Sequence, residues 1–257
     1  MNDLGPSDAR RVVCISGGTS GIGAGLVAAF LEAGDRVFTC GRNPDKVARL
    51  GADWPEPIEQ GQLTILTGDV TDARFRAELV DGIRAAAGRL DVLVNNAGVI
   101  LAAGDLEESV DAWRATLETN LIAPFSLVQS CLGLLELGRS PAVVNLSSAC
   151  ARHPFASCTS TSYSVSKAGL EMLTQRLALG LGPRGIRVNA VAPGVVASAM
   201  WGEHVELMQE TIEQRHVLGR EAVTPADVAA AVLFLVSPRA RLVTGATLAV
   251  DAGYALG

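Results

Sequence analysis

The 257-residue sequence lacks the features that would assign it to several common functional classes. It has no dense run of basic residues, and its formal net charge of −6 argues against a nucleic-acid partner, which needs a basic face to neutralise phosphates. No apolar segment approaches the roughly 18 residues of a membrane-spanning helix. The first residues carry an acid and turn formers where a signal peptide would have a basic flank and an apolar stretch. We therefore expect a soluble, cytoplasmic protein.

Other absences narrow the chemistry. The sequence has no G-x-S-x-G nucleophile turn and no phosphate-binding lysine loop, so the hydrolase and kinase classes lack their key residues. The three histidines are not spaced as a metal set, and none of the five cysteines forms a C-x-x-C pair. Because the cysteine count is odd, we expect no disulfide framework, a reduced chain, and only a spectator role for Cys150 and Cys158.

What the chain does have is a repeated alternation of short apolar strands and longer helices. This pattern predicts strands at residues 11–16, 36–40, 63–67, 91–94, 142–146, 187–191 and 247–250, and helices at 21–33, 71–88, 109–137, 161–181 and 225–236. Such alternation implies a parallel sheet covered on both faces, in one α/β domain spanning residues 1–257. Residues 195–223 break the pattern, and two interpretations stay open: a flap that covers a substrate, or an ordinary pair of surface helices.

A glycine-rich segment lies between the first predicted strand and the first predicted helix. It consists of Ser16, Gly17, Gly18, Thr19, Ser20, Gly21, Ile22 and Gly23. Glycines let the backbone approach a pyrophosphate, and the helix N-terminus behind them offers unpaired N–H groups. The spacing G-x-x-x-G-x-G differs from the commoner G-x-G-x-x-G, but its place between a strand and a helix indicates a dinucleotide site. A merely structural loop is the alternative.

The end of the second predicted strand indicates which dinucleotide binds. An acid at this position usually holds the ribose hydroxyls of NAD, whereas NADP-binding proteins provide a cation there. Here Gly41 occupies the position expected for the acid, and Arg42 follows it. A guanidinium can hold a 2′-phosphate with two hydrogen bonds, and we expect no neighbouring carboxylate to oppose it. NADP(H) is therefore favoured over NAD(H), with an exposed arginine at a strand end as the alternative.

Tyr163 and Lys167 form the candidate catalytic pair. They stand four residues apart in a predicted helix, on one face. A nearby ammonium would lower the pKa of the phenol, which is otherwise a poor proton donor at neutral pH. Only Lys46 and Lys167 among the 21 basic residues are lysines. A lysine here in a chain that otherwise uses arginine fits a role that needs a compact ammonium.

With the glycine segment, Tyr163 and Lys167 in order, the chain resembles the classical short-chain dehydrogenase/reductase family. Asn95-Asn96-Ala97-Gly98 and Val250-Asp251-Ala252-Gly253 extend the resemblance over nearly the whole length. The resemblance implies a Rossmann-type doubly wound parallel sheet of about seven strands with helices on both faces. It also implies a homotetramer or homodimer built on the long helices that start near Ser109 and Thr161.

The same resemblance assigns residues to the cofactor. Asp69 and Val70 would lie along the adenine, and Asn96 beside a ribose. Tyr163 and Lys167 would contact the nicotinamide end, where Lys167 would bind the ribose hydroxyls.

Two further positions match the family's nicotinamide and catalytic segments. Val196 and Ser198 match the segment that contacts the nicotinamide carboxamide. Asn120 matches the asparagine that holds a water in a proton relay to the lysine.

The chain departs from the family pattern at its carbonyl-binding serine. That serine normally lies about 13 residues before the tyrosine, whereas Ser148 lies 15 residues before Tyr163. The strand pattern favours Ser148 over Ser147 for this role. Residues 149–162 must absorb a two-residue insertion, which we expect to reshape the substrate pocket. Ser16 and Ser198 each replace a threonine and keep the hydroxyl.

These observations predict an NADP(H)-dependent oxidoreductase that transfers a hydride between the cofactor and a carbonyl or secondary alcohol. Asn120, Ser148, Tyr163 and Lys167 would be its catalytic residues, and no metal is expected. An NAD-dependent alcohol dehydrogenase of the same family is one alternative. A dinucleotide-binding protein without catalysis is the other, although such proteins typically lose the Tyr or the Lys. We expect a mid-sized, mostly apolar ketone or alcohol as the substrate, and no nucleic-acid or membrane partner.

Overall fold

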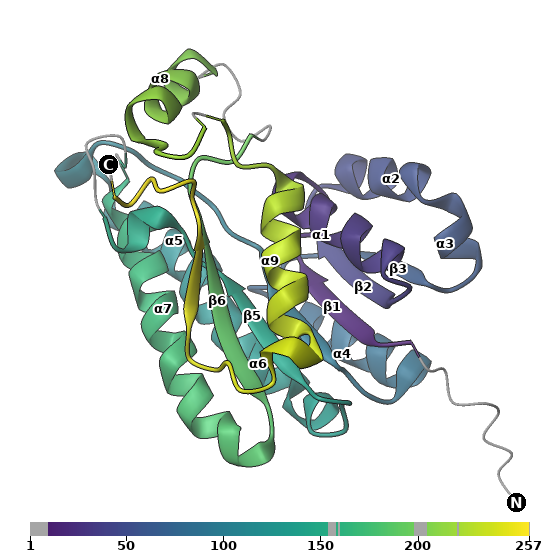
Figure 1. The fold of residues 1–257 in the computed structure, drawn as a ribbon. Coiled ribbons are helices and arrows are strands. Elements are labelled where there is room, and N and C mark those ends of the chain that lie inside the picture. The colour runs from purple at the N-terminus through teal and green to yellow at the C-terminus, as the bar shows by residue number, and fades with distance from the viewer. Residues whose placement is uncertain (1–9, 154–157, 159, 198–204, 220, 257) are drawn as a thin grey trace, which may run out of the picture.

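A computed structural model describes residues 10–153, 158, 160–197, 205–219 and 221–256 of the chain. Seven strands form one parallel sheet in the order β3-β2-β1-β4-β5-β6-β7 (Figure 1). Their bounds are β1 Val12–Ser16, β2 Arg36–Gly41, β3 Leu63–Thr67, β4 Val92–Asn95, β5 Ala142–Leu146, β6 Arg187–Pro193 and β7 Thr247–Val250. The predicted doubly wound parallel sheet is thus confirmed. Among the described residues, no helix is long and apolar enough to cross a membrane.

Helices cover both faces of this sheet. The principal helices are α1 Gly21–Glu32, α2 Pro44–Asp53, α3 Pro55–Glu59, α4 Ala73–Ala87, α5 Val110–Leu117, α6 Ala123–Leu135, α7 Thr161–Leu181, α8 Val205–Arg215 and α9 Pro225–Val236. Alternate residues of β1 point to opposite faces, as a strand requires. Val13 and Ile15 pack with α1 and α9, whereas Val12 and Cys14 pack with α4, α6 and α7. Both faces of β1 are therefore buried, which explains why residues 12–15 of this central strand are all apolar.

The predicted helix at 109–137 is interrupted in the structure. After α5 the chain forms a π-helical segment, Glu118–Ile122, before α6 begins. Pro124 lies in the first turn of α6, directly after the π-helical segment, where its missing N–H removes one bond of the regular α-helical ladder. A π-helical turn is rare and is often found at functional sites. The predicted helix is therefore present, but its hydrogen-bonding register changes at its centre, and this π-helical turn contains Asn120.

Two short helices were not predicted. Asn43 accepts hydrogen bonds from the N–H groups of Asp45 and Lys46, so it caps α2, and Pro44 occupies the first turn. α3 follows directly at Pro55. Both lie beyond β2 at one side of the sheet (Figure 1). Thr224 and Asp227 form a reciprocal capping box at the start of α9.

Strand order reverses between β1 and β4. Chain segments that leave these two strands therefore diverge to opposite sides and open a crevice at the carboxyl ends of the strands. The glycine-rich segment follows β1, and Asn96 follows β4. The fold thus brings these two segments to the position where open α/β sheets bind ligands.

Candidate active site

The glycine-rich segment packs so closely that side chains would not fit in it. A Cβ on Gly23 would lie 2.1 Å from the carbonyl oxygen of Gly17, and one on Gly18 would lie 2.0 Å from the Thr39 hydroxyl. Gly17 also has φ +70°, which favours glycine. The side chain of Ser20, the N-cap of α1, makes no capping hydrogen bond, and no acid lies in the first turn. The helix therefore presents open N–H groups and a positive dipole end to a close ligand.

Asn96 braces this segment from the end of β4. Its Nδ2 donates to the carbonyl oxygens of Ser16 and Gly17 at 3.0 and 2.9 Å. The Ser16 hydroxyl in turn accepts from the backbone N–H groups of Asn96 and Ala97 at 3.0 and 3.1 Å. A hydroxyl at position 16 is thus sufficient for this contact, as expected for a serine in place of threonine. These residues fit a dinucleotide, because the glycine positions expose the backbone of the segment and the segment ends at an uncapped helix N-terminus.

At the end of β2 the structure differs from the expectation that no carboxylate lies next to Arg42. Arg42 is exposed, but its Nη1 lies 3.3 Å from Oδ2 of Asp69, so a carboxylate does neighbour the guanidinium. The reason is strand pairing: Gly41 pairs with Thr67, which places the residues that follow β2 and β3 side by side. Burial raises the pKa of Asp69, but hydrogen bonds from Thr71 and the Arg42 charge outweigh it, and the net pKa lies below its ordinary value. The carboxylate therefore stays charged at neutral pH.

An acidic side chain in place of Gly41 at the end of β2 would collide with the side chain of Thr19 unless Thr19 moved. A Cβ on Gly41 would lie 2.5 Å from the hydroxyl oxygen of Thr19 in the glycine-rich segment. Val70, which the resemblance places along the adenine, is buried beside Cys40 and Phe75. Arg42 is therefore the charged side chain at the strand end, with Asp69 as its partner.

Tyr163 and Lys167 lie in the first two turns of α7. The Ser160 side chain accepts from the N–H of Tyr163 and caps this helix. Lys167 is 4% exposed, its Nζ lies 5.6 Å from the centre of the Tyr163 ring, and it donates to the carbonyl of Leu146 at 2.7 Å. Burial lowers the pKa of Lys167 to about 8. The pair thus shares one helix face beside the end of β5.

The pKa of the phenol differs from the sequence-based expectation. Burial raises the pKa of Tyr163 above its ordinary value, and a hydrogen bond with the Ser148 hydroxyl opposes this only in part. Lys167 donates to a backbone carbonyl instead of to the phenol oxygen, so the ammonium does not overcome the effect of burial. At neutral pH the phenol is therefore a protonated group.

Ser148 and Ser147 make different contacts. The Ser148 hydroxyl is near enough to Tyr163 to lower the pKa of the phenol, and it accepts from the N–H of Cys150 at 3.2 Å. The Ser147 hydroxyl instead donates to Oε1 of Glu171 at 3.1 Å, one turn beyond Lys167. Of the two serines, the described contacts thus bring Ser148 to the phenol.

Asn120 lies buried in the π-helical segment. Its side chain accepts from the N–H of Val99 at 2.8 Å and donates to the Val99 carbonyl at 2.9 Å and to the Ser166 hydroxyl at 3.0 Å. Gly98 lies between this amide and the lysine. A Cβ there would be 3.3 Å from Lys167 Nζ and 3.4 Å from Asn120 Oδ1. Gly98 therefore leaves the space between these groups open, a role that the sequence reading missed.

The segment that follows β6 forms a further wall of the candidate active site. Val196 is buried and forms an isolated bridge with Val223. This bridge joins the two ends of the segment predicted to cover the substrate, which contains α8. Ser198 lies outside the described residues. α8 lies apart from the sheet, near the C-terminus of the chain (Figure 1).

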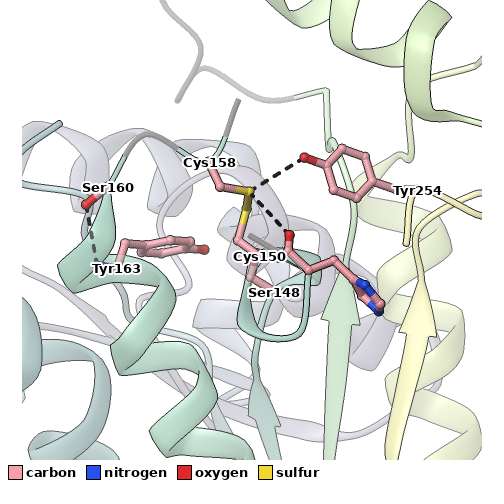
Figure 2. Close-up of a disulfide and its surroundings, with 7 residues drawn as sticks. Ser148, Cys150, Cys158, Ser160, Tyr163 and Tyr254 are labelled. Atoms are coloured by element: carbon pink, nitrogen blue, oxygen red, sulfur yellow. Dashed lines mark hydrogen bonds between the residues drawn. A yellow bond between two sulfur atoms is a disulfide. The ribbon is translucent and has the colours of Figure 1, made fainter. Parts of the chain in front are cut away.

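Cys150 and Cys158 form a disulfide, so the expectation of five free thiols was wrong. The turn Ala149–Ala151 and the return of the chain toward α7 bring the two Cα atoms to 6.0 Å. Figure 2 shows the disulfide between Tyr163 and Tyr254, above Ser148. The sequence did contain a signal for this disulfide, because two of the five cysteines lie within residues 149–162, the segment that absorbs the insertion. Cys14, Cys40 and Cys131 are free and buried.

The chain matches known proteins over nearly its whole length. Residues 17–255 match the family described as Enoyl-(Acyl carrier protein) reductase. The chain is 37% identical over 254 residues to cis-4-hydroxycyclohexanecarboxylate dehydrogenase of Sinomonas cyclohexanicum, covering 98% of this chain and 99% of that protein. It is 32% identical to the 3-oxoacyl-acyl-carrier-protein reductase FabG of Thermotoga maritima, covering 96% and 98%.

Solved structures agree with these relatives. The actinorhodin polyketide ketoreductase, solved with NADPH, superposes with a TM-score of 0.87 at 29% identity and covers 96% of this chain and 98% of its own. The chain belongs to the short-chain dehydrogenase/reductase family and is an oxidoreductase.

Proposed function

We propose that this protein transfers a hydride between NADP(H) and a carbonyl or secondary alcohol, with Tyr163 as the proton donor and acceptor. The observation that carries the proposal is the grouping of Tyr163, Ser148 and Lys167 at the ends of β5 and α7. A protonated phenol beside a serine hydroxyl can give its proton to a carbonyl oxygen and take it back in the reverse direction.

Each residue has a defined task in this proposal. Ser148 orients the substrate oxygen toward the Tyr163 phenol. Lys167 holds a positive charge near the phenol and binds the nicotinamide ribose, and Asn120 holds the water that links Lys167 to solvent. When bound, the cofactor supplies or accepts the hydride at its nicotinamide ring. The cradle at residues 16–23, Asn96, Asp69 and Val70 would hold the rest of the dinucleotide.

The preference for NADP(H) is supported by the end of β2. Arg42 is exposed and can reach a 2′-phosphate, and Gly41 occupies the position of the acid that holds the ribose hydroxyls of NAD. The Asp69 carboxylate at 3.3 Å competes with the phosphate for the guanidinium. The NADPH bound in the polyketide ketoreductase structure is consistent with this preference.

The substrate class is a mid-sized, mostly apolar ketone or its alcohol. The names of the two relatives refer to a hydroxycyclohexanecarboxylate dehydrogenase and a 3-oxoacyl reductase, one for each direction of such a reaction. Residues 195–223 would cover the substrate. NADPH consumption should first be screened across cyclic ketones, 3-oxoacyl thioesters and aliphatic ketones.

The deciding variant is Tyr163→Phe, which removes only the hydroxyl. With a ketone that the wild type reduces, we expect kcat to fall by about 10²–10⁴-fold, the usual contribution of general acid catalysis, while NADPH still binds. Cofactor fluorescence gives the binding control. A Tyr163→Phe protein that binds NADPH and turns over at the wild-type rate would refute the mechanism.

We also propose that the chain assembles as a homotetramer or homodimer through its long helices. Apolar side chains lie exposed on these helices: Val110 on α5, Phe125 on α6, and Met172 and Leu179 on α7. Exposed apolar side chains gathered on neighbouring helices are typical of surfaces that bind other chains. Light scattering coupled to size exclusion measures the mass. A monomer at micromolar concentration would contradict assembly.

A further inference from the structure

The two cysteines of the disulfide lie in the sequence between the two residues assigned to the substrate oxygen, Ser148 and Tyr163. Cys150 follows Ser148 by two residues, and its N–H donates to the Ser148 hydroxyl. Cys158 precedes Ser160 by two residues, and Ser160 caps the helix turn that carries Tyr163. The covalent bond therefore joins the chain just after the serine to the chain just before the tyrosine.

The disulfide also contacts the C-terminal segment. The hydroxyl of Tyr254 lies 3.6 Å from Cys158 Sγ, and because a disulfide sulfur has no proton, the phenol is the donor (Figure 2). Tyr254 is buried with Ala149, Val195 and Ile212, where Ile212 belongs to α8. One small apolar cluster thus links the residue after Ser148, the end of β6, α8 and the partner of the disulfide.

A second contact, an ion pair, holds the chain just after Cys150. Arg152 donates from Nε to Oε2 of Glu171 at 2.5 Å, and the other oxygen of this buried carboxylate accepts from Ser147. Arg152 lies within the ring that the disulfide closes. The described part of the ring is therefore held to α7 by an ion pair and to the C-terminal segment by Tyr254, and the disulfide joins its two ends.

We propose that the Cys150–Cys158 disulfide is a redox-sensitive positioning element of the substrate pocket. In the oxidised protein it holds the chain on both sides of the Ser148–Tyr163 pair and against the α8 cluster. Its reduction frees the inserted loop and lowers the fraction of molecules whose pocket is ready for substrate. This inference rests on the proposed function, because it names a regulation of the same site.

The chemical step requires a dithiol reductant. A dithiol attacks the Cys150–Cys158 bond, which breaks, and the reductant closes its own disulfide. The two electrons and two protons that it loses are gained by the two cysteine sulfurs as thiols. Both cysteines are partly exposed, so the bond can be reached.

The expected consequence is a change in substrate affinity rather than in cofactor affinity. If a fifth of the molecules keep a competent pocket after reduction, KM for the ketone rises about fivefold. NADPH is held by the glycine-rich segment, which is braced by Asn96 and not by the disulfide loop. Its Kd should therefore change less than about twofold.

Alkylation of the folded protein tests the bond itself. Burial raises the pKa of Cys14, of Cys40 to about 11 and of Cys131 to about 12, so these three thiols react poorly with iodoacetamide. We expect no alkylation of Cys150 or Cys158 before treatment with dithiothreitol, and alkylation of both after it. Peptide mass spectrometry locates the label. Alkylation of both residues in protein purified under air without reductant would overturn the proposal.

Steady-state kinetics test whether reduction of the disulfide raises KM for the ketone. KM for the ketone, kcat and the Kd of NADPH are measured for wild type before and after dithiothreitol, and for Cys150→Ser and Cys158→Ser. Both variants should match the reduced wild type and no longer respond to the reductant. Cys131→Ala, which removes a buried thiol in α6, should respond as the wild type does.

The outcomes separate the two proposals. A rise in KM for the ketone with unchanged NADPH binding supports the positioning role. Equal KM in both redox states overturns this inference and leaves the proposed function standing. Absence of turnover in both states, with NADPH bound, overturns both. Because the wild type is compared with itself, the test remains decisive even if a serine variant fails to fold.

Discussion

The cofactor side and the substrate side of this molecule are built on different physical principles. On the cofactor side, backbone atoms pack against one another at distances that exclude a Cβ, and one asparagine ties the segment to the next strand. On the substrate side, side chains from four distant segments meet in a small apolar cluster, and a disulfide closes the inserted loop. Backbone packing leaves a local signature in the sequence, whereas convergence of distant side chains does not.

The largest expected effect lies where the two sides meet, at Lys167. Burial places its pKa at about 8 in the folded protein, below its ordinary value of 10.5. Below pH 8 both folded and unfolded chains hold the proton, and the fold bears the full cost of a buried charge. Between pH 8 and 10.5 the unfolded chain binds more protons, so stability rises with pH.

This rise of stability with pH can be tested with the variant Lys167→Met. The free energy of unfolding of the wild type, minus that of the variant, should rise between pH 7 and pH 10.5 by up to about 3 kcal/mol, since one unit of pKa corresponds to about 1.4 kcal/mol. Chemical denaturation of the cofactor-free proteins measures it. A difference that stays constant with pH would show that Lys167 is not buried as described.

The two serines at the end of β5 give the next effect. Ser148→Ala removes the hydroxyl that contacts Tyr163, and we expect kcat to fall by about 10²-fold, as when one oxyanion donor is lost. Ser147→Ala is the matched control, because its hydroxyl faces Glu171 and its loss should leave kcat within about twofold. Equal losses in both variants would break the assignment of Ser148.

Much of the cofactor side was predictable from the sequence. Gly17–Gly23, Tyr163 and Lys167 stand at fixed places relative to strands and helices, so short-range patterns located them. The Arg42–Asp69 pair was not predictable in this way, because it depends on the register of β2 with β3 over 27 residues of sequence. A strand pairing is a property of the assembled sheet.

The substrate side was less predictable for a related reason. The π-helical turn at Asn120 interrupts a sequence whose apolar spacing reads as one helix. The disulfide depends on a turn inside the inserted segment, and the contact of Tyr254 with Cys158 joins residues 96 positions apart. Sequence spacing showed that an insertion exists, but only the fold shows what its ends contact.

The third prediction concerns cofactor affinity at the end of β2. Arg42→Ala should raise the Kd of NADPH by roughly 10–100-fold, the loss expected for hydrogen bonds to a charged group, and leave NADH binding nearly unchanged. Asp69→Asn removes the charge that competes for Arg42 but keeps a polar side chain of the same size at the position assigned to the adenine, and it should tighten NADPH binding. Titration of cofactor fluorescence measures both. An Arg42→Ala protein with an unaltered ratio of the two affinities would contradict NADP preference.

The smallest expected effect is on stability, at the N-terminus of α9. Thr224→Ala removes one half of the capping box at the start of α9 and should lower the free energy of unfolding by about 1 kcal/mol. KM and kcat should not change, because the cap contacts Asp227 and not the site. Denaturant melts and steady-state rates check both parts. A large kinetic effect would mean that α9 and the substrate side are more tightly coupled than their contacts indicate.

The central claim is that a hydride passes from the nicotinamide to a carbonyl carbon while the Tyr163 phenol gives its proton to the oxygen. The most direct measurement follows NADPH that carries deuterium at the transferable position of the nicotinamide, in ordinary water, with wild type and Tyr163→Phe. The account predicts an alcohol with one deuterium on the former carbonyl carbon from the wild type, and almost none from a variant that still binds NADPH. An alcohol without deuterium, or equal product from both proteins, would contradict it.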